Sequence, residues 1–379
     1  MTRKEILKNS KRIVVKVGSS ILCGSDGKFS RDCVKKIGKE ILYLLKIKKE
    51  CIIVSSGAIA CGMDLIQVNK RPTELPLLQA CAAIGQGKLM KVYEDFFVKK
   101  KFHTAQILLT QDIFHDRQRY LNTRNTFNAL IELGILPIVN ENDTVVTDEI
   151  RFGDNDRLSS AVAQITGADL LINLSNVGGV LDGDKNVVPQ IGSEHELESL
   201  KKMIFESKAE KTVGGMKSKL DAAKILMSSG IPMIIADGKD FSILKKIIEG
   251  KNIGTLFIPF EQKASFVKTW LIYSSSPKGK LVLDSGASDA IQNKGKSLLP
   301  SGISALEGHF KAGDAVLVTT EKGRDIARGL TNYSREELDK IHGKKTAEIE
   351  GTLGYKFYDE VIHRDNLALF KERGGDHGN

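Results

Sequence analysis

Short apolar runs alternate with longer amphipathic stretches from Ile13 to about Pro259. Several runs consist almost wholly of Val, Ile and Leu, which is typical of strands buried on both faces of a parallel sheet. They predict strands at Ile13–Val17, Cys51–Val54, Ala105–Leu109, Ile135–Val139, Leu170–Leu174, Met233–Ala236 and Thr255–Ile258. The stretches between them predict helices at Asp32–Lys46, Tyr120–Leu133, Leu158–Ile165 and Lys217–Ser229. This alternation predicts an α/β fold, a three-layer sandwich with a mostly parallel central sheet.

The pattern changes after Pro259. Residues 261–277 mix charges with three consecutive serines and a proline, a composition typical of a linker. Beyond them, short strand-like runs are separated by Gly, Asp and Ser, and Glu321-Lys322-Gly323 is predicted to turn between two strands. We therefore predict a first domain at 1–260, a linker at 261–277, a small β-rich domain at 278–370 and a disordered tail at 371–379.

Composition narrows the class of protein. A chain of 379 residues is longer than a single hydrophobic core usually supports, which predicts two domains. A content of 41% hydrophobic and 27% charged residues is typical of a soluble globular protein. The five cysteines include no C-x-x-C pair, so we expect reduced thiols in place of disulfides or a zinc ribbon. Neither a signal peptide nor a membrane-length apolar run is present, which predicts a cytoplasmic protein.

The net charge of +9 favours anionic partners such as nucleotides, acidic metabolites or RNA. A lysine-rich surface without a special function explains the same charge equally simply. Charge alone therefore chooses no partner.

Two polar clusters lie close together in the middle of the chain. Asn140-Glu141-Asn142-Asp143 directly follows a predicted strand, and Gly153-Asp154-Asn155-Asp156 directly precedes a predicted helix. Open α/β sheets bind ligands beyond the carboxyl ends of their strands. The two clusters are therefore predicted to hold a small polar ligand.

Three strand ends or loops are rich in small residues. The first strand carries Lys16 and ends at Gly18, the second runs into Ser55-Ser56-Gly57, and Thr212–Lys219 contains a predicted Gly-Gly turn. Free N–H groups and an ammonium at such turns can bind phosphate or carboxylate. Taken singly, each motif is also explained by a snorkelling lysine, simple turn packing or a solvated loop. None matches a P-loop.

Together these motifs resemble the amino acid kinase family. The resemblance rests on Val15–Ser20, Ser55–Ala60, Val139–Asp143, Gly153–Asp156 and Gly214–Lys219, which occur in that order. The paired clusters point to the branch of the family that acts on glutamate. The C-terminal residues Ser297–Ile303, Phe310–Val316 and Gly323–Gly329 resemble a PUA domain, a small β-rich barrel.

The resemblance implies ATP-dependent phosphorylation of the side-chain carboxylate of L-glutamate, the first step of proline biosynthesis, with Mg²⁺ accompanying ATP. It assigns Lys16, Lys219 and Asp156 to catalysis. Ser56, Asp143 and Asn155 are implied to bind glutamate. The implied ATP-binding residues are Lys16, Gly18, Ser175, Asn176, Val213, Gly214, Gly215, Met216, Lys217, Ser218 and Lys219. The resemblance implies no metal ion bound by the protein itself. It does imply a homo-oligomer that is inhibited by proline.

The chain departs from the family pattern at one position, and two other functions are compatible with the sequence. Family members usually carry Thr-Asp or Ser-Asp where this chain has Ser175-Asn176, so an uncharged amide replaces a carboxylate beside the nucleotide. Another kinase of the same fold, acting on acetylglutamate, aspartate or a nucleotide, is the first alternative. The second is an RNA-binding protein acting through the PUA-like domain.

Overall fold

A computed structural model describes residues 2–68, 70–110, 117–145, 155–206, 210–260, 271 and 277–370. The described residues divide into two compact units: residues 2–110 and 118–260 belong to the first, and residues 277–370 belong to the second. Most of the predicted linker and the whole predicted tail lie outside the described residues, as do Gly153 and Asp154.

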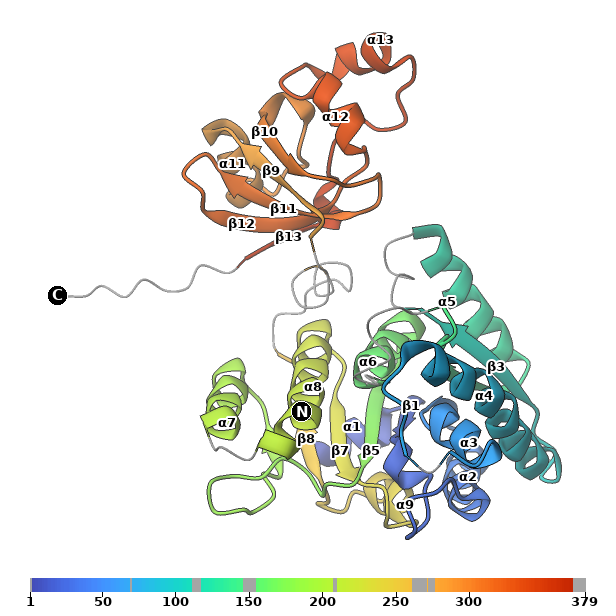
Figure 1. The fold of residues 1–379 in the computed structure, drawn as a ribbon. Helices are drawn as coiled ribbons and strands as arrows, with labels where there is room; N and C mark the ends of the chain where they lie inside the picture. Colours follow the sequence, from blue (N-terminus) through green and yellow to red (C-terminus); the bar gives the residue numbers. More distant parts are fainter. Residues whose placement is uncertain are drawn as a thin grey trace. The chain divides into compact units, whose positions relative to one another are not determined.

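The first unit is built on an eight-stranded sheet with strand order β3-β4-β2-β1-β5-β7-β8-β6 (Figure 1). All neighbouring strands are parallel except β7 and β8, which confirms the predicted mostly parallel sheet. The strands are β1 (Arg12–Val17), β2 (Glu50–Ser55), β3 (Thr104–Leu109), β4 (Leu136–Glu141), β5 (Leu170–Ser175), β6 (Gln190–Ile191), β7 (Met233–Asp237) and β8 (Thr255–Phe257).

Helices cover the two faces of this sheet. They are α1 (Arg3–Asn9), η1 (Ser19–Ile21), α2 (Arg31–Lys46), α3 (Ala58–Leu65), α4 (Leu75–Val98), α5 (Arg117–Glu132), α6 (Asn155–Thr166), α7 (Glu194–Glu206), α8 (Glu210–Ser229) and α9 (Ile243–Ile248). Val15 and Val17 of β1 pack into a buried cluster with residues of α2 and α4. Because side chains alternate along a strand, Lys16 points to the opposite face, which α6 and α8 cover.

Helix α4 was absent from the sequence prediction, although it is the longest helix described. Its 24 residues include buried Leu89, Tyr93 and Phe97, but its apolar positions do not form a narrow stripe. Such a helix is hard to recognise by periodicity because apolar residues such as Ile84 and Val98 lie exposed outside its buried face. Within the described residues, no helix is long and apolar enough to cross a membrane.

The predicted Gly214-Gly215 turn is wrong, because α8 begins at Glu210 and runs through both glycines. Each glycine costs a helix roughly 1 kcal/mol relative to alanine. The fully buried residues farther along, Leu220 and Ala223 among them, pack this helix beside α6 and offset that cost.

The second unit is β-rich, as predicted. Its sheet has the order β10-β9-β11-β12-β13 and a buried core of its own. Its elements are β9 (Gly279–Leu283), α11 (Ser285–Gln292), η3 (Pro300–Gly302), β10 (Ile303–Gly308), β11 (Ala315–Thr320), β12 (Asp325–Leu330), α12 (Arg335–Ile341), η4 (Thr346–Glu348), α13 (Ile349–Leu353), η5 (Arg364–Asn366) and β13 (Leu367–Leu369). The predicted turn at Glu321-Lys322-Gly323 joins β11 to β12.

Candidate active site

Polar side chains of the first unit converge beyond the carboxyl ends of β1, β2, β4 and β5. Helix α6 follows β4 in the chain and begins at Asn155 and Asp156, so its first turn lies above these strand ends. Two networks start from these consecutive residues. We call Lys16, Asp156 and Lys219 the charged cluster, and Ser56, Asn155, Asn140 and Gln86 the amide row.

In the charged cluster one carboxylate lies between two ammonium groups. Lys16 Nζ is 2.6 Å from Asp156 Oδ1, and Lys219 Nζ is 3.0 Å from Asp156 Oδ2. Asp156 and Lys16 are only 4% and 6% exposed. A strand, a helix start and a second helix thus bring together the three residues that the sequence assigned to catalysis.

The ionisation of Asp156 follows from this arrangement. Burial by itself would raise the pKa of its carboxyl, but the charges of Lys16 and Lys219, with hydrogen bonds from Lys16 and Asn173, outweigh burial and hold the pKa at about 2. Asp156 is therefore an anion at neutral pH. A single anion between two cations leaves a net positive charge, which suits the binding of a phosphate group.

Asn173 belongs to the same network and was missed by the sequence prediction. It lies in β5 directly opposite Lys16 in the strand register, is fully buried, and donates from Nδ2 to Asp156 Oδ1 at 2.8 Å. Its Oδ1 is buried without a hydrogen-bond partner in the described structure. An amide in the otherwise apolar run Leu170–Leu174 was a usable signal, since such a group is costly unless it has a partner.

The amide row crosses from α6 to α4 over the end of the sheet. Asn155 Nδ2 donates to Ser56 Oγ at 2.8 Å and to Asn140 Oδ1 at 3.2 Å. Asn140 Nδ2 in turn donates to Gln86 Oε1 at 2.8 Å. Two predicted glutamate ligands are thus in direct contact, and two residues that the sequence prediction left unassigned, Asn140 and Gln86, extend the row.

The hydrogen bonds of the amide row determine which of its N–H and O–H groups could still donate to a ligand. Both N–H groups of the Asn155 amide have acceptors inside the protein, because Ser55 O lies 3.5 Å away in addition to Ser56 and Asn140. Ser56 Oγ accepts from Asn155 and keeps its own hydrogen to donate. A carboxylate entering here would meet the Ser56 hydroxyl first.

Asp143 follows β4 in a turn held by a hydrogen bond from Thr144 Oγ1 to Asn142 Oδ1. Burial raises the pKa of Asp143 to about 6, an effect that the charge of Arg71 partly offsets. A carboxylate with so little compensating positive charge would be stabilised by a ligand cation such as an α-ammonium group.

The turn after β1 brings the backbone close to the ammonium group of Lys16. The N–H of Gly18 donates to Leu174 O at 3.1 Å, so this group is already occupied. A Cβ at Gly18 would lie 3.3 Å from Leu174 O, which is a tight contact, and 3.9 Å from Lys16 Nζ, which is an ordinary one. The next residues, Ser19 and Ser20, are exposed at the start of η1.

The remaining predicted ATP-binding residues lie on α8 and at the end of β5. Val213 to Lys219 are helical, so the N–H groups of Gly214 and Gly215 lie past the first turn, where they bond within the helix. Ser218 Oγ donates to Asp156 Oδ2 at 3.3 Å, whereas Lys217 is exposed. Ser175 Oγ is buried without a partner among the described residues, and Asn176 beside it is exposed.

The fold and this site define a class of protein. Residues 11–237 match the amino acid kinase family, and residues 279–353 match the PUA domain. The chain therefore belongs to the amino acid kinase family and is a kinase followed by a PUA domain.

Close relatives narrow the class further. Glutamate 5-kinase from Caldanaerobacter subterraneus subsp. tengcongensis is 45% identical over 97% of this chain and 100% of its own length. Glutamate 5-kinase from Thermoanaerobacter sp. (strain X514) is 44% identical over 96% of this chain and 98% of its own. The enzyme of the same name from Syntrophotalea carbinolica is 44% identical over 97% and 100%. Within its family, the chain thus groups with the glutamate 5-kinases.

Proposed function

We propose that this chain transfers the γ-phosphoryl group of ATP to the side-chain carboxylate of L-glutamate, giving L-glutamyl 5-phosphate and ADP, the first step of proline biosynthesis. The main support for this proposal is the buried charged cluster. In it, the carboxylate oxygens of Asp156 lie 2.6 Å from Lys16 Nζ and 3.0 Å from Lys219 Nζ. The names of the relatives support the choice of glutamate.

The reaction needs positioning and charge balance more than proton transfer. A glutamate side chain, with a pKa of about 4.3, is ionised at neutral pH and needs no general base to become a nucleophile. Its carboxylate oxygen forms the new bond to the γ-phosphorus, while the bond from that phosphorus to the β–γ bridging oxygen breaks. Two anions must approach each other, so catalysis rests on cations placed around the transferred group.

The charged cluster supplies those cations. Lys16 and Lys219 come from different elements and share one carboxylate, so their ammonium groups are held apart yet close to one point. We assign both to the oxygens of the transferred phosphoryl group, and Asp156 to the positioning of both lysines. Preorganised charges in a buried site stabilise a transition state without reorganising during the reaction.

The substrate side is assigned to Ser56, Asp143 and the amide row. The Ser56 hydroxyl donates to a glutamate carboxylate, Asn155 holds that hydroxyl, and Asp143 accepts from the α-ammonium group. ATP is assigned to the turn at Gly18, the end of β5 at Ser175 and Asn176, and the start of α8.

Mg²⁺ would be held mainly by the ATP phosphates and water, as is usual for this ion. Both oxygens of Asp156 already accept hydrogen bonds from lysines, so a direct metal bond at that carboxylate does not fit. The described residues contain no group of three or more His, Cys, Asp or Glu side chains that could hold a metal.

The deciding experiment traps the product. Purified enzyme with ATP, Mg²⁺ and L-glutamate should form an acyl phosphate that hydroxylamine converts to a hydroxamate. Acetylglutamate, aspartate and UMP serve as the competing acceptors. A higher kcat/KM with any of these than with glutamate would overturn the proposed substrate.

Control by proline and assembly into a homo-oligomer are part of the same proposal. Inhibition of hydroxamate formation by proline, and the mass of the particle in solution, test them separately. Proline without effect on turnover would remove it as a regulator.

RNA is a second proposed partner, through the PUA domain. A cavity of about 670 Å³ in this unit is lined by Lys296, His363 and Arg364 together with Asp284 and mostly apolar residues, so two cationic side chains are available to contact phosphates. Binding of structured RNA should weaken steeply as salt rises, and Lys296→Glu should weaken it further. Absence of binding at low salt would dismiss this partner.

A further inference from the structure

Gln86 of α4 ends the amide row, and its position is fixed by unusually close packing of two helices. A Cβ at Gly85 would lie 1.8 Å from Ala58 O, and one at Gly62 would lie 1.8 Å from Cys81 O. Only glycine allows such an approach, so α4 rests directly on the backbone of α3 at these two points. The first of them is one residue before Gln86, which leaves its side chain little freedom to shift along the helix.

Asn140 meets Gln86 on the same face of the sheet. Ile138 and Leu136 of β4 pack into the cluster that contains α4 residues, and side chains alternate along the strand, so Asn140 points to that face as well. Asn140 is 3% exposed and uses its Nδ2 on Gln86 Oε1. The described structure shows no other acceptor for this amide nitrogen.

The acceptor oxygen of Gln86 lies at one end of the row and matches its direction. With Nδ2 of Asn140 turned to Gln86, its Oδ1 is turned to Asn155 and accepts from that amide at 3.2 Å. Were Asn140 turned over, two amide nitrogens would face each other and neither could accept. Asn155 donates to Ser55 O and Asn140 Oδ1 as well as to Ser56 Oγ at 2.8 Å, so the Asn140 oxygen that Gln86 orients is one of the acceptors that turn the Asn155 amide toward Ser56.

We propose that Gln86 is a positioning residue for the phosphoryl acceptor: its Oε1 orients Asn140 and Asn155 so that the Ser56 hydroxyl donates to the substrate carboxylate. This inference rests on the proposed function, since it takes glutamate to be the acceptor. Gln86 does not belong to the charged cluster, so its effect should fall on glutamate and leave ATP and the chemical step unchanged.

The test compares Gln86→Met with Gln86→Glu. Methionine keeps the length of the side chain and removes the acceptor, so KM for glutamate should rise about tenfold, the loss typical of one buried hydrogen bond, with kcat and KM for ATP within about twofold. The Gln86→Glu variant keeps an acceptor oxygen toward Asn140 and should recover most of that loss. A purely structural defect would move kcat and both KM values together.

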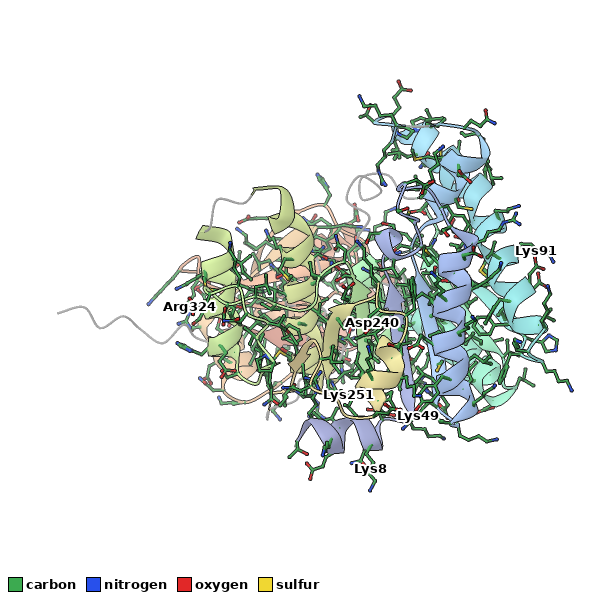
Figure 2. The ribbon with its side chains drawn as sticks, turned by 90° about the horizontal axis from the view of Figure 1, so that it is seen from below. Lys8, Lys49, Lys91, Asp240, Lys251 and Arg324 are labelled. Atoms are coloured by element: carbon green, nitrogen blue, oxygen red, sulfur yellow. The ribbon has the colours of Figure 1, made fainter. Side chains whose placement is uncertain are left out.

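Matched controls keep the result clear. Lys91→Met alters the same helix at a side chain that is 63% exposed and points away from the protein, and should leave all three constants unchanged (Figure 2). Circular dichroism establishes that each variant is folded. If Gln86→Met does not fold, Gln86→Ala takes its place, because alanine is the best helix former.

Two outcomes would overturn the inference while leaving the proposed function standing. One is an unchanged KM for glutamate in the folded methionine or alanine variant. The other is a loss in Gln86→Glu as large as in Gln86→Met, which would show that the acceptor oxygen is not what matters. Failure of the wild-type enzyme to form the glutamate hydroxamate would instead remove the proposed function itself.

Discussion

Asn155 and Asp156 are neighbours in the chain, yet they belong to networks of different chemistry. Asp156 is held by two ammonium groups, whereas Asn155 is held by a hydroxyl and an amide. A buried charge without its partner is very costly, so the charged cluster is defined by ion pairing. An amide carries no net charge but has a donor end and an acceptor end, so the amide row is defined by direction.

This difference matches the two tasks of the site. The charged cluster is suited to stabilise negative charge that spreads over the phosphoryl group in the transition state, which is a matter of kcat. The amide row is suited to hold an acceptor of fixed shape in one orientation, which is a matter of KM. Variants in the two networks should therefore differ in their kinetics, with loss of kcat in the charged cluster and a higher KM for glutamate in the amide row.

The largest effect is expected in the charged cluster. Lys16→Ala and Lys219→Ala should each lower kcat at least about 10²-fold, the loss typical of one donor to a transition state. Hydroxamate formation at saturating ATP and glutamate measures this effect. Lys251→Ala, at an exposed lysine on the periphery of the same unit, is the control and should leave kcat unchanged (Figure 2). Near-normal turnover by either folded cluster variant would reject the assignment.

Asp143 should show the opposite kinetic pattern. Asp143→Ala removes the carboxylate assigned to the α-ammonium group, so KM for glutamate should rise roughly 10–100-fold, as expected for a hydrogen bond to a charged group. The change in kcat should be much smaller. Steady-state kinetics with glutamate varied at saturating ATP give both values, and an unchanged KM would count against the assignment.

Asn173 tests whether support of Asp156 acts on the chemical step. Asn173→Leu keeps a similar size and removes the donor that lies 2.8 Å from Asp156 Oδ1. We expect kcat to fall about tenfold, since hydrogen bonds to charged groups contribute roughly 1.5–3 kcal/mol, while KM for glutamate stays within about twofold. A rise confined to that KM would place Asn173 with the amide row.

The smallest effect is a pH dependence that Asp143 should cause. Its pKa is raised to about 6, and only the ionised carboxylate attracts the α-ammonium group. Affinity for glutamate should therefore be constant well above pH 6 and decline as the carboxyl takes up its proton below it. At pH 5.5 the protonated form should reduce kcat/KM for glutamate about fourfold.

Comparison with Asp143→Asn isolates this titration from that of the nucleotide. The variant has no proton to take up at position 143, so the ratio of wild-type to variant kcat/KM should fall between pH 7 and pH 5.5. A ratio that stays constant across this range would show that Asp143 does not titrate there.

Some features of the fold and of the site can be predicted from neighbouring residues in the sequence, whereas others depend on contacts between distant segments. Buried parallel strands such as β1 and β5 stand out as continuous apolar runs, because both of their faces pack against helices. Lys16 could be recognised because it is a charged residue within such an apolar run. Asn173 gave the same signal in β5 and was passed over. The start of α8 was misread because two glycines resemble a turn locally, whereas packing against α6 makes them helical.

The sequence by itself determined the alternation of strands and helices, the division into two domains and the polar residues at the strand ends, since each depends on neighbouring positions and on burial. Only the tertiary structure decided which of those residues meet. Lys16 and Lys219 share one carboxylate, and Asn140 reaches Gln86, because the sheet order and the close packing of α3 on α4 bring distant segments together. The direction of the hydrogen-bonded row depends on where its acceptors lie, and no local pattern in the chain records their positions.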